Sequence, residues 1–272
     1  MAAVATMDER KINRLVEERK QLEERERVHK VEKRCRYGDA DACKALASMY
    51  RFTCGNAAEA IASAATKLDT PSKKVAPQAL TACSKLANLY LRGVGVEQNA
   101  GNAMKLLHFG CQHQHVNSCF TAGVLRNFGF PDGGQEQVSA ANRIEVDKGM
   151  ANDYLTVACF GGHGTACNLL AQNFNEVKPP TQQSKATTAG LFHRACELNH
   201  VASCANFGLM CLYGVGMRQP DHSLAKKYLT RACDAKHIAA CNGLQTLTRM
   251  LKELDDASQN DAGPAADKSG GA

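Results

Sequence analysis

The 272-residue sequence contains no tryptophan, and only 6% of its residues are aromatic. Small and aliphatic side chains must therefore form the core, and the 44% of apolar residues are enough for one. No apolar run approaches the roughly 18 residues of a membrane span, so we expect no membrane span. The N-terminal segment lacks an apolar h-region and is rich in acidic side chains, which argues against a secretory signal and an ordinary mitochondrial transit peptide.

The sequence also lacks the common motifs of catalysis. It has no C-x-x-C, phosphate-binding glycine loop, H-E-x-x-H or nucleophile elbow. Ser223 and Lys226 fit S-x-x-K, but without S-D-N or K-T-G, and Ser223 is expected to be a helix N-cap. The net charge of +6 is modest and no Lys/Arg-rich run occurs, so nothing indicates nucleic-acid binding. We therefore expect a protein that is not an enzyme and has no catalytic residues.

Cysteine, in contrast, is abundant and regularly spaced. The chain has thirteen cysteines, and random placement would leave only about 0.6 of them with a partner eight positions on. Five such pairs occur: Cys35 and Cys43, Cys111 and Cys119, Cys159 and Cys167, Cys196 and Cys204, and Cys233 and Cys241. A histidine lies midway in four of them (His115, His163, His200 and His237), and Asp39 takes that place in the first. The pairs are thus a repeated unit.

The pairs also define an internal period. Cys159, Cys196 and Cys233 follow one another at intervals of 37 residues. Residues 83–111 and 204–233 share one pattern, in which an apolar helix, a G-V-G turn and a second amphipathic helix follow in order. Glycine tolerates the positive φ at which such helices end. A period of this size predicts an all-α solenoid of helical hairpins.

The pattern L-x-x-L-Y-x-x-G-x-G-V, followed by A-x-x-[YL]-[LY] and a closing A-C or G-C before H-x-x-x-C, resembles the Sel-one-like repeat, a relative of the tetratricopeptide hairpin. With a cysteine pair at each junction, the chain resembles the cysteine-rich subgroup, which includes bacterial secreted proteins and a mitochondrial assembly factor of cytochrome c oxidase. The resemblance covers about residues 35–254 and is most specific at 83–119 and 196–241. It implies a scaffold that binds proteins on the concave face of the solenoid.

We expect three regions. Residues 1–34 contain a charged helix with ten basic and eight acidic residues between positions 8 and 34. Its apolar residues keep no heptad, which favours a solvated helix over a coiled coil. Residues 35–254 form the solenoid, with about five repeats and a C-terminal capping helix, and residues 255–272 are expected to be disordered.

The geometry of the cysteine pairs favours disulfides. On one continuous helix the two cysteines would lie about 12 Å apart, whereas a disulfide needs Cα atoms roughly 4.4–6.8 Å apart. The intervening segments contain turn residues such as Gly162, Asn199 and Asp234. We therefore predict five disulfides, each joining the end of one hairpin to the start of the next and each contributing about 2–3 kcal/mol by chain entropy.

Two other roles for the pairs stay open. His108 and His193 each precede the first cysteine of a pair by three residues, so each of these two junctions offers four possible zinc ligands. Thr156 and Thr230 occupy that place elsewhere. The best location for a metal or haem would be the cluster of His108, His113 and His115. In the resembled repeats, the central histidine is a turn residue. A thiol-redox role would need an exposed, low-pKa cysteine. We predict no metal, cofactor or catalytic residues.

Three cysteines remain, and we predict free thiols at Cys54, Cys83 and Cys211. The position eight residues before Cys83 is Val75, so Cys83 lacks the usual partner. Cys54 is expected near the turn of the first hairpin, whereas Cys83 is expected to start the next hairpin, at the opposite end of the array's width. Cys211 takes a buried apolar position.

Paired cysteines without a signal peptide point to the mitochondrial intermembrane space, where a disulfide relay oxidises incoming chains. Together with the resemblance, this predicts a non-enzymatic scaffold that assists assembly of a respiratory complex, cytochrome c oxidase, or is an accessory subunit of one. The expected partners are respiratory-chain subunits or assembly factors, without nucleic acid or a membrane span. The alternatives are a thiol-redox or haem/metal-handling protein, and a secreted protein that binds β-lactams or peptidoglycan.

Overall fold

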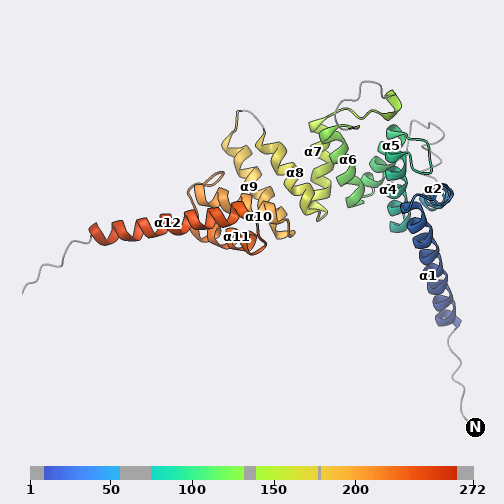
Figure 1. Ribbon diagram of the computed structural model, residues 1–272, viewed down its shortest axis with the longest axis horizontal. Helices are drawn as coiled ribbons and strands as arrows, with labels where there is room; N and C mark the ends of the chain where they lie inside the picture. Colours follow the sequence, from blue (N-terminus) through green and yellow to red (C-terminus); the bar gives the residue numbers. More distant parts are fainter. Residues whose placement is uncertain (1–8, 56–74, 132–138, 177–178, 262–272) are drawn as a thin grey trace, which may run out of the picture. The chain divides into compact units, whose positions relative to one another are not determined.

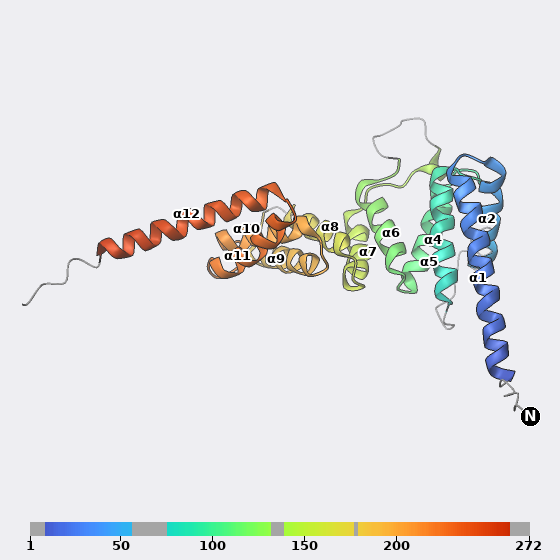
Figure 2. The ribbon, with the colours of Figure 1, turned by 60° about the horizontal axis from the view of Figure 1, so that its bottom comes forward.

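The computed structural model describes residues 9–55, 75–131, 139–176 and 179–261. The chain divides after Asp147 into two compact units, and both are helical (Figures 1 and 2). In the described ranges, extended pairing is limited to one isolated bridge between Phe130 and Ile144. None of the described helices is long and apolar enough to cross a membrane.

The N-terminal unit is a series of helices in which each described helix packs on the next. Its helices are α1 (Glu9–Arg36), α2 (Ala40–Cys54), α4 (Pro77–Arg92), α5 (Ala100–Gln112) and α6 (Val116–Phe128), followed by the short 3-10 helix η1 (Ala140–Asn142). Leu86, Leu106 and Leu107 are fully buried between α4 and α5 and their neighbours. The core of this unit therefore consists mainly of leucine, alanine and cysteine, with few large aromatic side chains.

The C-terminal unit repeats this arrangement. Its helices are α7 (Lys148–Phe160), α8 (Gly164–Asn175), α9 (Gln182–Glu197), α10 (Val201–Tyr213), α11 (His222–Asp234) and α12 (Ile238–Asp261). Each helix packs on its neighbour in sequence, and α12 also contacts α10. The predicted fold class, an all-α array of helical hairpins cross-linked by disulfides, is confirmed.

The G-V-G turns have two different structural roles. The first glycine of each, Gly93 or Gly214, ends a helix in the left-handed conformation, with φ of 65° and 69°. The second glycine also has positive φ and lies against a neighbouring helix. A Cβ at Gly95 would lie 2.2 Å from the Cys43 carbonyl oxygen, and one at Gly216 would lie 2.4 Å from that of Lys185. Only glycine allows this close contact between backbones.

The two terminal helices extend beyond the packed hairpins of their own units (Figures 1 and 2). Helix α1 has no fully buried side chain in its described residues and carries ion pairs along its surface, such as Arg14–Glu18 and Arg19–Glu23. Helix α12 continues to Asp261, so the predicted disordered tail starts too early at 255. The residues that follow 254 include no glycine or proline before Gly263, and nothing there stops the helix. The rest of the predicted tail, residues 262–272, lies outside the described residues.

Candidate functional site

The cysteine junctions share one backbone geometry. In each C-x7-C pair, the first cysteine is the penultimate residue of a helix and the second is the fourth residue of the next. The helix ends in a left-handed residue at the same place each time: Gly38, Gln114, Gly162, Asn199 and Lys236. At the fourth junction, the Asn199 N–H donates to the Cys196 carbonyl at 2.9 Å and the His200 N–H to that of Ala195 at 3.0 Å. This pair of hydrogen bonds is a Schellman motif.

The central residue of each pair begins the next helix. His163 Nδ1 accepts from the Ala166 N–H at 3.2 Å, and His200 Nδ1 accepts from the Ser203 N–H at 3.3 Å. His115 Nδ1 lies 2.8 Å from the Ser118 hydroxyl. His163 and His200 are therefore N-caps, whereas the His115 side chain caps no backbone N–H. His237 precedes α12 in the same way, but its buried Nδ1 has no hydrogen-bond partner. All four histidines thus occupy the turn position that the resemblance implied.

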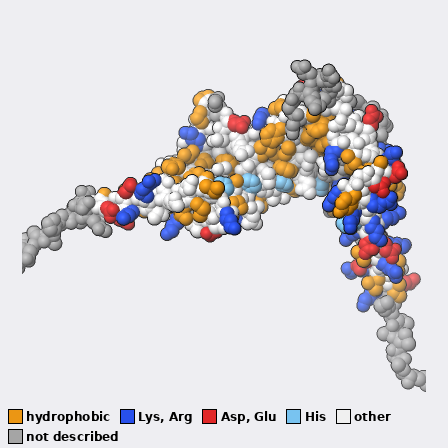
Figure 3. Space-filling view, in the orientation of Figure 1, with side chains coloured by type: hydrophobic (Ala, Val, Ile, Leu, Met, Phe, Trp, Pro, Cys, Tyr) orange, Lys and Arg blue, Asp and Glu red, His pale blue; other side chains and the backbone are white. Residues whose placement is uncertain are grey.

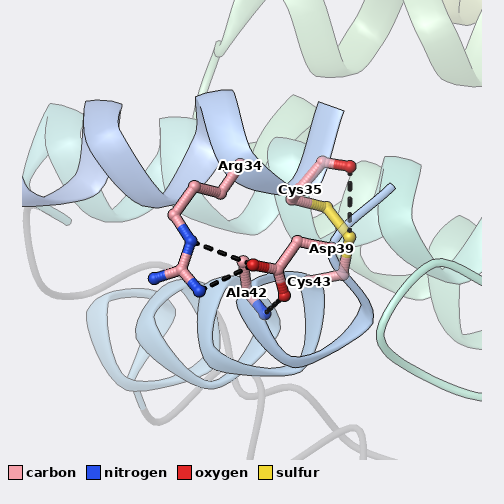
Figure 4. Close-up of polar contacts among 5 residues, drawn as sticks. All are labelled: Arg34, Cys35, Asp39, Ala42 and Cys43. Atoms are coloured by element: carbon pink, nitrogen blue, oxygen red, sulfur yellow. Dashed lines mark hydrogen bonds and ion pairs between the residues drawn. A yellow bond between two sulfur atoms is a disulfide. The ribbon is translucent and has the colours of Figure 1, made fainter. Parts of the chain in front are cut away.

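The first junction uses a carboxylate in place of imidazole. Asp39 Oδ1 accepts from the Ala42 N–H at 2.9 Å, and Arg34 Nη2 donates to Asp39 Oδ2 at 2.6 Å (Figure 4). The Ala42 N–H and the Arg34 guanidinium hold the pKa of Asp39 below its usual value. In contrast, burial lowers the pKa of His115, His163 and His200. The neutral imidazole, which can accept at Nδ1, is thus the favoured form at these junctions.

The structure joins both cysteines of every C-x7-C pair. The S–S distances lie between 1.97 and 2.09 Å, and the Cα atoms of each pair are 4.6 or 4.7 Å apart. The cysteines of the three middle pairs are buried, whereas Cys35, Cys233 and Cys241 are partly exposed. Each bridge thus fastens consecutive helices across the tight turn.

The prediction of free thiols at Cys54 and Cys83 is wrong for this structure, which joins them with Cα atoms 4.9 Å apart. Cys54 ends α2, and Cys83 lies in the first half of α4. Gly95, which follows α4, lies against Cys43 near the start of α2. The two helices are therefore antiparallel and packed directly on each other, which places the end of α2 at Cys54 beside the first half of α4 at Cys83. The repeat period predicts that α2 and α4 are the first helices of successive hairpins, which would place the two cysteines at opposite ends.

Cys211 has no disulfide partner and is fully buried in α10. Burial, with a smaller contribution from the Asp221 carboxylate, raises the pKa of its thiol to about 11. A thiol in this environment is not activated as a nucleophile. It fills an apolar position, as the sequence suggests.

The histidines considered as metal ligands have other contacts. His193 Nε2 lies 2.7 Å from the Tyr228 hydroxyl, and its ring packs against Phe207 with centroids 4.7 Å apart. His113 packs on Phe109 at 4.7 Å. Among the described residues, no three His, Cys, Asp or Glu side chains are grouped so that they could hold a metal ion.

Helix α11 has a different N-cap from the one the sequence suggests. Asp221 caps it by accepting from the Leu224 N–H at 2.8 Å. Ser223, the expected N-cap, is instead the second residue of the helix. Asp221 was missed because positions 221 and 223, separated by one residue, both carry side chains that are favoured at caps.

A polar network in the N-terminal unit was also not predicted. Glu32 of α1 accepts from the Tyr50 hydroxyl of α2 and from Lys85 Nζ of α4, the latter at 2.6 Å. Burial opposes ionisation of Glu32, but the hydrogen bonds from Lys85 and Tyr50 outweigh it and lower the pKa of the carboxyl. Burial and the hydrogen bond to Glu32 raise the pKa of Tyr50. No local motif signals this network because its members lie far apart in the sequence.

The comparisons with known proteins agree with this architecture. Residues 80–115 and 201–237 match the Sel1 repeat. Cytochrome c oxidase assembly factor 7 of Xenopus tropicalis is 24% identical over 188 residues, which cover 66% of this chain and 72% of that protein. The Mus musculus protein of the same name is 33% identical over 91 residues, covering 32% and 39%.

A solved structure supports the fold. The Sel1 repeat protein from Oxalobacter formigenes superposes with a TM-score of 0.50 at 18% identity, and the match covers 72% of each chain. The chain therefore contains Sel1 repeats, and it is similar in sequence to cytochrome c oxidase assembly factor 7 of Xenopus tropicalis.

Proposed function

We propose that this protein is a non-enzymatic, protein-binding scaffold that assists the assembly of cytochrome c oxidase in the mitochondrial intermembrane space. The similarity to vertebrate assembly factors over 66% of the chain is the observation that carries the proposal. In this proposal, the Sel1 repeats supply the binding surface on the concave face of the array, and respiratory-chain subunits or assembly factors are its partners.

The disulfides support the proposed compartment. Six bridges join consecutive described helices, and such bonds form and persist in oxidising compartments. The remaining thiol is buried with a raised pKa, so oxidised cysteines serve to hold the hairpins together. A rigid, cross-linked array presents a preformed surface to a partner, which lowers the entropic cost of binding.

The proposal is tested in the source organism by deleting the gene and resolving respiratory complexes on native gels. We expect less assembled cytochrome c oxidase and recovery when the wild-type chain is restored. An epitope-tagged chain should resist protease in intact mitochondria and become digested when the outer membrane alone is ruptured. Unchanged oxidase levels would contradict the assembly role. Resistance of the tagged chain to protease after the outer membrane is ruptured would contradict the proposed compartment.

A further inference from the structure

A groove of about 820 Å³ lies on the N-terminal unit between α1, α2 and α4. This volume is that of a small-molecule cleft, roughly 300–1,000 Å³, so the groove can take a few side chains of a longer segment. Leu46 and Leu89, both nearly fully buried, lie in its floor together with Val94. The groove therefore offers an apolar floor of limited area.

The rim of this groove is basic. Four basic side chains line the groove, from Arg36, Lys44, Lys85 and Arg92, against one acidic side chain, Glu32. Glu32 is already paired with Lys85 at 2.6 Å. Figure 3 shows Lys and Arg side chains gathered over this part of the unit, with Asp and Glu among them.

Three of the basic side chains remain available to a ligand. Arg36 and Arg92 are exposed and have no ion pair among the described residues. Lys44 has only a long surface contact, 4.0 Å from the Asp41 carboxylate, and exposed pairs of this kind contribute little. Arg36, Lys44 and Arg92 thus line the groove together with the apolar Leu46, Leu89 and Val94, and their positive charge is little compensated by acidic side chains. This surface is here called the basic groove.

We infer that the basic groove binds an acidic, amphipathic segment of a partner protein. Apolar side chains of the segment would cover Leu46 and Leu89, while its carboxylates pair with Arg36, Lys44 and Arg92. The exposed Asn88 in the lining offers an amide for the backbone of the segment. A recess with an apolar floor suits a peptide better than a lipid bilayer, because a bilayer presents a broad surface that does not enter a cleft.

This inference rests on the proposed function, since it gives the scaffold one binding face and its partner a stated chemistry. It concerns only the N-terminal unit, within which all the residues of the groove lie. Opposite charges across such a rim mainly raise the association rate and the specificity. Binding should therefore weaken as salt rises, since the three cations are exposed to solvent.

The test uses the full-length oxidised chain and a fluorescein-labelled peptide of about 14 residues, with leucine at every third or fourth position and glutamate elsewhere. Fluorescence anisotropy gives the dissociation constant. We expect the triple variant Arg36→Glu, Lys44→Glu, Arg92→Glu to weaken binding by at least about tenfold. A milder variant with glutamine at the same positions should show a smaller loss and covers the case in which charge reversal disturbs folding.

The matched control reverses three exposed basic residues of the C-terminal unit, Arg218, Lys227 and Arg249. It carries the same net charge as the triple variant, so it should bind the peptide with nearly wild-type affinity. Equal loss in both variants, or no loss in either groove variant, would overturn the basic groove. It would also be overturned if vesicles with anionic lipids bound through the same three residues and the peptide did not compete.

The outcome can be separated from that of the proposed function by restoring each variant to the deletion strain. If the triple variant restores cytochrome c oxidase and does not differ from wild type in peptide binding, the groove fails and the scaffold role stands. If peptide binding depends on the groove but deletion leaves the oxidase unchanged, the groove stands and the assembly role fails.

Discussion

At the scale of single residues, the junctions depend on two adjacent positions. The sequence shows the cysteines and the histidine midway between them, and both take the expected places. It does not show that the residue before the histidine is left-handed, because Gln114, Asn199 and Lys236 occupy that position as well as glycine. Non-glycine residues in this conformation carry little sequence signal. The local hydrogen bonds of the Schellman motif and N-cap, rather than residue identity alone, determine the turn.

His200 provides a direct test of the N-cap. Replacing it with alanine removes the side-chain acceptor for the Ser203 N–H and leaves only the His200 carbonyl at 3.0 Å, so we expect the free energy of unfolding to fall by about 1 kcal/mol. His200→Asn should be close to wild type, because the asparagine side chain is also a good N-cap. Urea unfolding followed by circular dichroism measures both variants. Equal losses for alanine and asparagine would show that imidazole packing, not capping, is what matters.

The same histidines make stability depend on pH. Burial lowers the folded-state pKa of His115, His163 and His200, whereas the unfolded chain titrates near about 6.5. Below that pH the unfolded state takes up protons first, so stability is full above about pH 6.5 and falls as the pH decreases. The urea midpoint should be lower at about pH 5.5 than at about 7.5, and His200→Asn should reduce the difference. An unchanged difference would contradict a role for His200.

At the scale of helices, the apolar periodicity and the G-V-G turns were sufficient to predict most hairpins. The error at Cys54 and Cys83 arose from hairpin phase. The period placed α2 and α4 as equivalent helices of successive repeats, which would run parallel, whereas they pack antiparallel and directly on each other. Phase depends on long-range packing, and residues 43–82 lack the G-V-G turn that would have revealed it.

In the C-terminal unit, two helical glycines give a matched test of helix packing. A Cβ at Gly208 in α10 would lie 2.8 Å from Leu229 Cγ and 3.0 Å from the Leu229 backbone nitrogen, whereas a Cβ at Gly190 in α9 would meet nothing within 4 Å. We expect Gly208→Ala to destabilise the protein by about 1–3 kcal/mol through overpacking. Gly190→Ala should stabilise it by about 0.5–1 kcal/mol through helix propensity.

Denaturant unfolding of the two glycine variants, under the same oxidising conditions, measures both changes. A stabilising effect of Gly208→Ala would mean that α10 and α11 can move apart without cost. A loss with Gly190→Ala would mean that this face of α9 is covered by another part of the chain.

At the scale of the whole molecule, the period of the cysteine pairs was sufficient to predict the architecture, because the same junction recurs between consecutive helices. The division into two compact units was not predicted. It falls at Asp147, at the end of residues 129–148, where the sequence replaces the G-V-G turn with a longer segment. Loss of the turn removes the close backbone contact that the second glycine makes elsewhere.

The repeated junction also predicts the order in which the disulfides are reduced. Thiol–disulfide exchange requires a thiolate to reach a sulfur atom. Cys35, Cys233 and Cys241 are partly exposed, whereas the cysteines of the other four bridges are buried. The bridges Cys35–Cys43 and Cys233–Cys241 should therefore open first in limiting dithiothreitol, before the protein unfolds. Timed alkylation and peptide mapping by mass spectrometry identify the cysteines released at each step.

Cys211 serves as the internal control in that experiment. It is a thiol from the start, but it is fully buried with a raised pKa, so its alkylation should report opening of the C-terminal unit rather than reduction. We expect label at Cys35, Cys43, Cys233 and Cys241 while Cys211 remains unlabelled. If the middle bridges are reduced together with the outer ones and Cys211 is labelled at the same time, opening of the repeats precedes reduction. Access to sulfur would then be governed by unfolding, not by position in the array.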